Sequence, residues 1–166
     1  MSCKNCKSRS LKKIINIGKQ PISSHFYKKK MSNLRNYSLD LYICKKCELI
    51  QFKTLPKLNQ MYGLNYGYRT SLSPLMINHM KKKYLSLKKD LNKKNCNILD
   101  IGCNDGTFLN FFKSFKNLNL YGIDPSAEKF QEYHSKKINL IVDYFKKEKI
   151  DKKYNKNNFE LITSFA

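Results

Sequence analysis

No apolar run in this sequence of 166 residues approaches the roughly 18 residues that a membrane-spanning helix needs, and the mean hydropathy is −0.61. The first ten residues are partly basic, but they contain no continuous apolar stretch and no small-residue cleavage site typical of a secretory signal. We therefore expect a cytoplasmic protein with no membrane partner. At about 100–200 residues per domain, the length predicts one domain, or one domain with a small module.

Acidic residues are scarce, since 12 Asp and Glu stand against 33 Lys and Arg and give a formal net charge of +21. Such a charge attracts polyanions. Arginine is scarce as well, because only Arg9, Arg35 and Arg69 carry the guanidinium group that base-edge and bidentate phosphate recognition favour. The lysines are spread along the whole chain. We interpret most of the charge as solvated surface and do not expect specific nucleic-acid binding.

Four of the six cysteines form two C-x-x-C pairs, Cys3 with Cys6 and Cys44 with Cys47. A two-residue gap allows both thiolates of a pair to bind one ion, and two pairs complete the tetrahedral shell that zinc prefers. In a reducing cytosol such pairs indicate metal ligands before disulfides, and a thioredoxin-like redox pair is the rival interpretation. Four protein ligands leave no open coordination position, so we predict a structural zinc ion.

The chain is expected to have three parts. Residues 1–55 form a small zinc-binding module whose core is too small to fold on burial alone, so the metal contributes to its folding. Residues 56–95 carry a tyrosine- and glycine-rich segment and then a helix with Ser73 as its N-cap and Pro74 at its first position. Residues 96–166 alternate strands with helices, which predicts a parallel, doubly wound α/β sheet with its ligand at the carboxyl ends of the strands.

Two connections in the third part indicate a nucleoside site. The first strand ends in a glycine-bearing turn, 102–106, where a ligand can approach the backbone and the free N–H groups of a helix beginning at Thr107. The second strand ends in Asp124, from which a carboxylate can accept from both hydroxyls of a ribose, and Ser126 is a candidate cap for the next helix. The structural alternative is an α/β domain whose glycines only make turns. The strands are predicted at 97–101, 119–123, 139–142 and 159–164.

Two of these segments, 99–106 and 122–126, resemble the S-adenosylmethionine motifs of class I methyltransferases. With the cysteine pairs and the segment 66–71, the chain resembles the zinc-containing sugar C-methyltransferases that act on nucleotide-linked deoxysugars. The order of zinc module, tyrosine-rich segment and cofactor motif is more specific than any single piece. The resemblance implies zinc and S-adenosylmethionine as cofactors and a nucleotide-sugar as the small-molecule substrate.

The resemblance also implies residue roles at the methionine end of the cofactor. It places Gly102, Asn104 and Gly106 along that end and Asp105 as a turn-former facing the same pocket. Asp124 would hold the ribose.

At the adenine end the resemblance places Pro125 and Asp143, with Tyr144 beside them. It offers Tyr66 and Tyr68 as weak candidates for the reacting end, and Arg69 near them. Packing between two modules is the alternative for the tyrosines. We interpret Asp100 as bracing the glycine turn.

The sequence departs from that family in length, because the family sheet has seven strands in the order three, two, one, four, five, seven, six. Methylation of a carbon beside a ketone requires a base, and none of His25, His79 and His134 lies in a matching motif. We therefore expect a partial doubly wound Rossmann-like sheet of the first four strands, preceded by the zinc module. Such a chain is expected to have little or no turnover alone, as a gene fragment or as one half completed by a companion chain.

A hypothesis of a different class is a zinc-ribbon binding module for nucleic acid or a protein partner. It would use the lysine-rich surface together with stacking of tyrosine and phenylalanine rings. Both hypotheses predict one zinc ion per chain, so the metal alone does not distinguish them.

Overall fold

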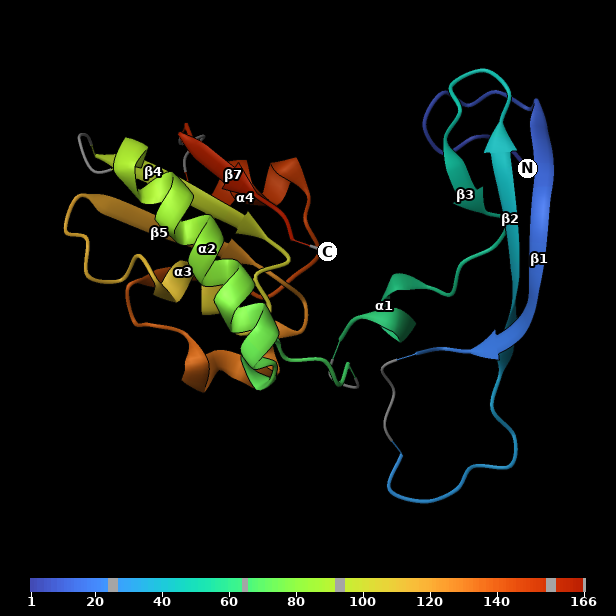
Figure 1. Ribbon diagram of the computed structural model, residues 1–166, viewed down its shortest axis with the longest axis horizontal. Helices are drawn as coiled ribbons and strands as arrows, with labels where there is room; N and C mark the ends of the chain where they lie inside the picture. The colour runs from blue at the N-terminus through green and yellow to red at the C-terminus, as the bar shows by residue number, and fades with distance from the viewer. Residues whose placement is uncertain (24–26, 64–65, 92–94, 155–157, 166) are drawn as a thin grey trace. The chain divides into compact units, whose positions relative to one another are not determined.

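The computed structural model describes residues 1–23, 27–63, 66–91, 95–154 and 158–165, so that His25 lies outside the described residues. The chain divides into two compact units, Met1–Gly67 and Tyr68–Ala166. The division falls within the tyrosine-rich segment, with Tyr66 in the first unit and Tyr68 in the second. Figure 1 shows the helices and strands of both units.

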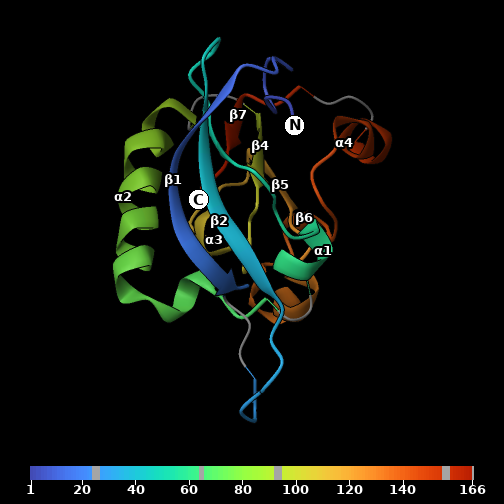
Figure 2. The same ribbon diagram turned by 90° about the vertical axis from the view of Figure 1, so that its right-hand side faces the viewer.

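The first unit is built on an antiparallel sheet of three strands, in the order β1-β2-β3. Figure 2 shows β1 and β2 as two long neighbouring strands. The β-prone pieces around the second cysteine pair form β2 and β3. The strand β1 was not predicted, because its isoleucines do not alternate with polar residues. Nearly all of its residues are exposed. The elements of this unit are β1 (Leu11–Pro21), β2 (Asn36–Cys44), β3 (Ile50–Phe52) and the single turn α1 (Leu58–Met61).

The second unit contains a parallel sheet of four strands in the order β6-β5-β4-β7. Counted within this unit, the order is three, two, one, four, which confirms the expected α/β class and the first four positions of the expected sheet. The strands are β4 (Cys96–Ile101), β5 (Leu118–Ile123), β6 (Ile138–Ile141) and β7 (Leu161–Thr163).

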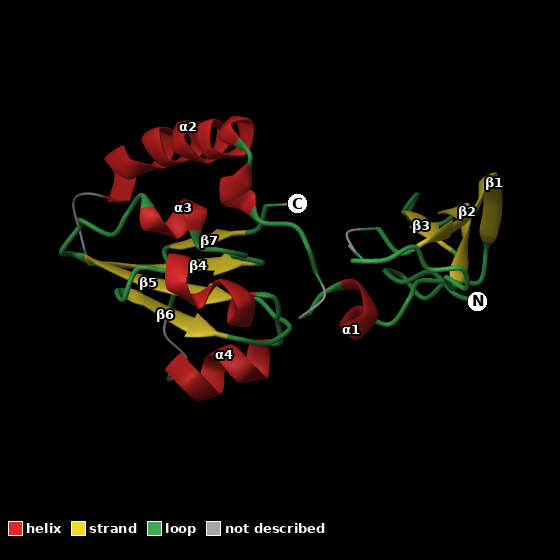
Figure 3. Cartoon of the chain, turned by 90° about the horizontal axis from the view of Figure 1, so that it is seen from below, coloured by secondary structure: helices red, strands yellow, loops and turns green. Residues whose placement is uncertain are grey.

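Helices cover both faces of this sheet, with α2 and α3 on one face and α4 on the other (Figure 3). Ile98 of β4 packs in the cluster that includes residues of α2 and α3, and its neighbour Leu99 packs in the cluster that includes α4. Alternate strand residues therefore supply two cores. The helical elements are η1 (Thr70–Leu72), α2 (Pro74–Leu91), α3 (Thr107–Asn110), η2 (Ala127–Tyr133) and α4 (Lys147–Tyr154).

The predicted start of α2 is confirmed. Pro74 is its first residue, and the hydroxyl of Ser73 accepts a hydrogen bond from the N–H of Met76 at 3.3 Å. A proline at this position gives up an N–H that has no partner within the helix. Among the described helices, none combines the length and apolar character needed to cross a lipid bilayer.

Ser126 occupies the N-cap position of η2, as predicted, but its side chain makes no capping hydrogen bond. Its hydroxyl donates to Asp124 at 2.6 Å. The following segment is a 3-10 run with a non-helical residue, Phe130, at φ −119° and ψ 17°. A hydroxyl committed to a neighbouring carboxylate cannot close the first turn of an α-helix.

Candidate functional site

The four cysteines of the two C-x-x-C pairs converge in the first unit. All four sulfur atoms lie within 4.8 Å of one another, with 3.5 Å between the sulfurs of Cys3 and Cys47 and 3.6 Å between those of Cys6 and Cys44. A tetrahedral shell with Zn–S bonds of about 2.3 Å separates its sulfurs by about 3.8 Å. The cluster therefore fits one zinc ion, whereas a redox pair would leave the other two cysteines unexplained.

Both pairs lie in the same type of backbone turn. The N–H of Lys7 donates to the carbonyl oxygen of Cys3 at 3.1 Å, and the N–H of Glu48 donates to that of Cys44 at 2.9 Å. Lys7 and Glu48 both have φ of 60°, in the left-handed region. The pairing of Leu11 with Cys44 joins the two turns through the β1–β2 ladder.

Backbone N–H groups favour the thiolate form of the second pair. A hydrogen bond from the N–H of Leu49 is the main cause that lowers the pKa of Cys47 to about 6. The N–H groups of Cys47 and Lys46 likewise lower the pKa of Cys44, against the effect of burial. Thiolates are the form that binds metal, so the turn prepares its sulfurs as ligands.

Gln51 of β3 supports the first pair and was not predicted from the sequence. Its side-chain oxygen accepts a hydrogen bond from the N–H of Lys4 at 2.8 Å, and its amide nitrogen donates to the carbonyl oxygen of Ser2 at 3.4 Å. The side chain is buried. No local sequence signal links a glutamine on one strand to a turn 47 residues earlier.

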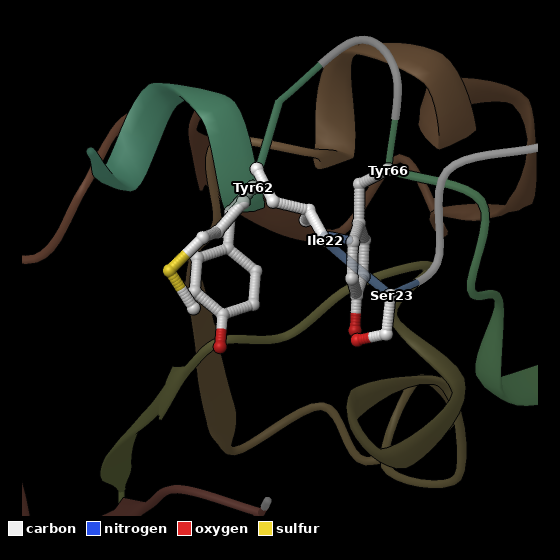
Figure 4. Close-up of a pocket in the computed structure, with 5 residues that line it drawn as sticks. Ile22, Ser23, Tyr62 and Tyr66 are labelled. Atoms are coloured by element: carbon white, nitrogen blue, oxygen red, sulfur yellow. The ribbon is translucent and has the colours of Figure 1, made fainter. Parts of the chain in front are cut away.

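Tyr66 lies in a hollow of the first unit. Figure 4 shows the side chains that line this hollow. The rings of Tyr62 and Tyr66 meet edge to face, with 5.3 Å between their centroids. This contact is packing within the first unit, and the role of Tyr66 at a reacting end stays a prediction. The hollow is lined by Ile22, Ser23, Met61, Tyr62 and Tyr66.

In the second unit, the glycine turn between β4 and α3 has three residues in the left-handed region, Gly102 at φ 77°, Asn104 at 48° and Gly106 at 72°. A Cβ added at Gly102 would meet no atom within 4 Å, so its backbone faces open space that a ligand can enter. A Cβ at Gly106 would lie 2.6 Å from Cδ2 of His134. The imidazole therefore covers that side of Gly106.

The side chain of Asn104 hydrogen-bonds the segment 68–71 to the glycine turn. Its side-chain oxygen accepts hydrogen bonds from the N–H of Thr70 at 2.9 Å and from the Thr70 hydroxyl at 3.2 Å. Its amide nitrogen donates to the carbonyl oxygen of Tyr68 at 3.2 Å and to the hydroxyl of Ser126 at 3.3 Å. The buried side chain thus bonds to protein groups on two sides of the turn.

Asp105 makes a second connection to the same segment. One carboxylate oxygen accepts from the N–H and the hydroxyl of Thr107, at 3.1 and 2.6 Å, as a turn-former does. The other oxygen accepts from the N–H of Ser71 at 2.8 Å. Thr70 and Ser71 were not predicted as partners of the turn, because each lies 34 residues before its partner in the sequence.

Asp124, at the end of β5, lies against the turn. One carboxylate oxygen accepts from the backbone N–H of Asn104 at 2.9 Å, and the other accepts from the N–H and the hydroxyl of Ser126, both at 2.6 Å. A carboxylate has about four acceptor positions. Within the described residues these three donors leave one position for a ligand hydroxyl.

A further acid, Asp143, lies at the same carboxyl edge of the sheet as Asp124. Asp143 follows β6, accepts a hydrogen bond from the N–H of Tyr144 at 2.7 Å and forms an ion pair with Lys149. Burial raises the pKa of Tyr144. Pro125, next to Asp124, is half-buried. The carboxyl ends of β4 and β5 are thus followed by Gly102 and Asp124 in register, and Asp143 lies one residue beyond the corresponding position after β6.

Asp100 does not brace the glycine turn as predicted. Its carboxylate accepts a hydrogen bond from the hydroxyl of Thr163 on β7 at 2.8 Å, so it joins two strands. Burial is the main cause that raises the pKa of Asp100 to about 7, and the charge of Asp124 acts in the same direction.

A parallel α/β sheet with a glycine turn after its first strand and an acid after its second is typical of domains that bind a nucleotide cofactor. Comparison with known families makes this class specific. A family model described as "Methyltransferase domain" matches residues 76–166, and one described as "Putative zinc binding domain" matches residues 3–62. The first match covers more than half of the chain, which therefore belongs to the methyltransferase-domain family. No curated protein matches the sequence.

We expect the purified chain to hold one zinc ion, and the substitution Cys47→Ser to abolish its retention, because three thiolates do not complete the shell. Metal analysis after gel filtration measures this. Removal of the metal with a chelator should also unfold the first unit, since metal binding supplies its folding free energy.

Cys96→Ser is the matched control, because Cys96 is buried in the second unit, and this variant should retain zinc. A wild-type chain without zinc, or undiminished zinc in Cys47→Ser, would contradict the assignment.

The raised pKa of Asp100 predicts a pH-dependent stability. Between pH of about 4 and 7 the folded chain keeps a proton on Asp100 that the unfolded chain has released, so the free energy of unfolding falls as the pH rises through 7. From about pH 5 to 8 this loss amounts to about 2–3 kcal/mol. Asp100→Asn, which preserves an acceptor for Thr163, should flatten the profile in urea unfolding followed by helical circular dichroism. Parallel profiles of the two chains would show that Asp100 is not the titrating group.

Proposed function

We propose that the chain binds S-adenosylmethionine at the carboxyl ends of β4, β5 and β6 and serves in methyl transfer. The observation that supports this most is the open backbone at Gly102, next to a turn that is hydrogen-bonded to Asp124. The cofactor supplies an electrophilic methyl group. The chain's own residues bind and orient it.

In this proposal, the residues at the carboxyl ends of the three strands bind different parts of the cofactor. Gly102 admits the methionine end to the backbone, because no side chain fills the space above it. Asp124 offers its one remaining acceptor position to a ribose hydroxyl. Asp143, held by Lys149 and by the N–H of Tyr144, borders the adenine together with Pro125.

The acceptor in our proposal is a nucleotide-linked keto-deoxysugar, methylated at carbon. The support is the resemblance of the whole chain, namely its order of zinc module, tyrosine-rich segment and cofactor motif. A carbon beside a ketone becomes nucleophilic when a base removes its proton. The zinc ion has four cysteine ligands in this proposal and is structural.

Asp124→Ala should weaken binding of S-adenosylhomocysteine at least about tenfold, because a hydrogen bond to a charged group contributes roughly 1.5–3 kcal/mol. Isothermal titration calorimetry measures the change. Asp151→Ala is the control, since Asp151 is an acid of α4 in an exposed pair with Lys147. Equal affinities of the wild type and Asp124→Ala, both folded by circular dichroism, would disprove the role of Asp124.

The acceptor class is distinguished from the nucleic-acid alternative by titrating a nucleotide-linked keto-deoxysugar and a DNA duplex in parallel, with S-adenosylhomocysteine present. We expect saturable binding of the sugar nucleotide and only weak DNA binding that disappears at about 0.3 M salt, as expected for lysine-rich surfaces. DNA binding that persists at this salt, without affinity for the sugar nucleotide, would favour the alternative.

A further inference from the structure

Arg69 has a buried donor without a protein partner. Its Nε has no hydrogen-bond partner within the described residues, and none of the ion pairs found there includes Arg69. Its guanidinium carbon lies 4.1 Å from the ring centroid of Tyr133. A buried N–H that is left unsatisfied costs free energy, so such a donor indicates a missing acceptor.

The backbone on both sides of Arg69 is fixed at the glycine turn. The side chain of Asn104 donates to the carbonyl oxygen of Tyr68 and accepts from the N–H of Thr70, so it holds the residues that flank Arg69. Asp105 accepts from the N–H of Ser71. Arg69 itself is extended, with φ of −136° and ψ of 126°.

The aromatic partner is fixed at the same turn from another element. The carbonyl oxygen of Tyr133, at the end of η2, accepts a hydrogen bond from the side chain of Asn110 at 2.8 Å, and Asn110 is the last residue of α3. The next residue, His134, lies against Gly106. Hydrogen bonds from Asn104 thus hold the segment of Arg69, and a hydrogen bond from Asn110 holds Tyr133.

The acids at the turn have other partners. Asp105 and Asp124 both accept hydrogen bonds from backbone N–H groups and from hydroxyls, and neither forms an ion pair with Arg69. Stacking on Tyr133 occupies the face of the guanidinium and leaves its edge, which carries the N–H groups. An edge with a free Nε–H matches the two oxygens of a carboxylate.

We propose that Arg69 binds the carboxylate of the cofactor's methionine moiety, an inference that rests on the function proposed above. Asn104, Asp105 and Tyr133 position Arg69 in this arrangement, because they hold its segment and its guanidinium group. A phosphate of the acceptor offers similar oxyanion chemistry, and the experiment separates the two sources.

The test compares S-adenosylhomocysteine with 5′-methylthioadenosine, which lacks the amino-acid carboxylate. Arg69→Met should weaken binding of S-adenosylhomocysteine by roughly tenfold to a hundredfold, as for loss of a charge-assisted hydrogen bond, and leave binding of methylthioadenosine unchanged. Arg69→Lys should lie between them, because an ammonium group keeps the charge but not the planar fork. Calorimetry on the full chain gives all affinities.

Arg35→Met is the matched control, because Arg35 is also stacked on a tyrosine, Tyr37, but in the first unit. It should change neither affinity. Equal losses for both compounds in Arg69→Met would show that Arg69 only holds the turn. Unchanged affinity for S-adenosylhomocysteine with lost affinity for the sugar nucleotide would assign Arg69 to the acceptor phosphate instead. Both results overturn the inference alone, whereas a wild-type chain that binds neither adenosine compound overturns the proposed function with it.

Discussion

The hydrogen bond from the backbone N–H of Asn104 to the carboxylate of Asp124 joins the ends of two neighbouring parallel strands, and the candidate cofactor site depends on it. Asn104 is a non-glycine residue in the left-handed region, a conformation that needs support from its surroundings. Asp124 and the amide contacts of the Asn104 side chain supply that support. Since Asp105 and Asn104 also hold the segment 68–71, one network fixes the turn and the residues over it.

The two units are stabilised by different means. In the first unit, the buried side chains among the described residues are Cys3, Cys44 and Gln51, all at the cysteine cluster. Such a unit has almost no apolar core, so a bound metal would supply the folding free energy that burial does not. The second unit buries two apolar clusters against opposite faces of its sheet. Apolar burial is therefore the main source of stability for the second unit.

The features that could be predicted from the sequence are those that depend on neighbouring residues. The apolar runs of β4 and β5, the glycine after β4 and the Ser73–Pro74 start of α2 are all encoded by neighbouring residues, and the structure has them. The rest depends on contacts between distant segments. The strand β1 exists because it pairs with β2, and the hydroxyl of Ser126 binds the carboxylate of Asp124 instead of capping the helical segment that follows. The partners of Asn104 and Asp105 could not be read from the sequence for the same reason.

The chain as a whole is strongly positive, whereas the candidate site is bordered by negatively charged groups. The chain carries a net charge of +21, whereas the turn between β4 and α3 is bordered by the buried carboxylates of Asp105 and Asp124. Surface charges more than about 8–10 Å away are screened at physiological ionic strength, so the nearby acids determine the local potential. In the function proposed above, the two acids would favour the positively charged sulfonium group of the cofactor, and the lysines would attract an anionic acceptor. Arg69, the cation held directly at the turn, then gives the site a separate position for an anionic group.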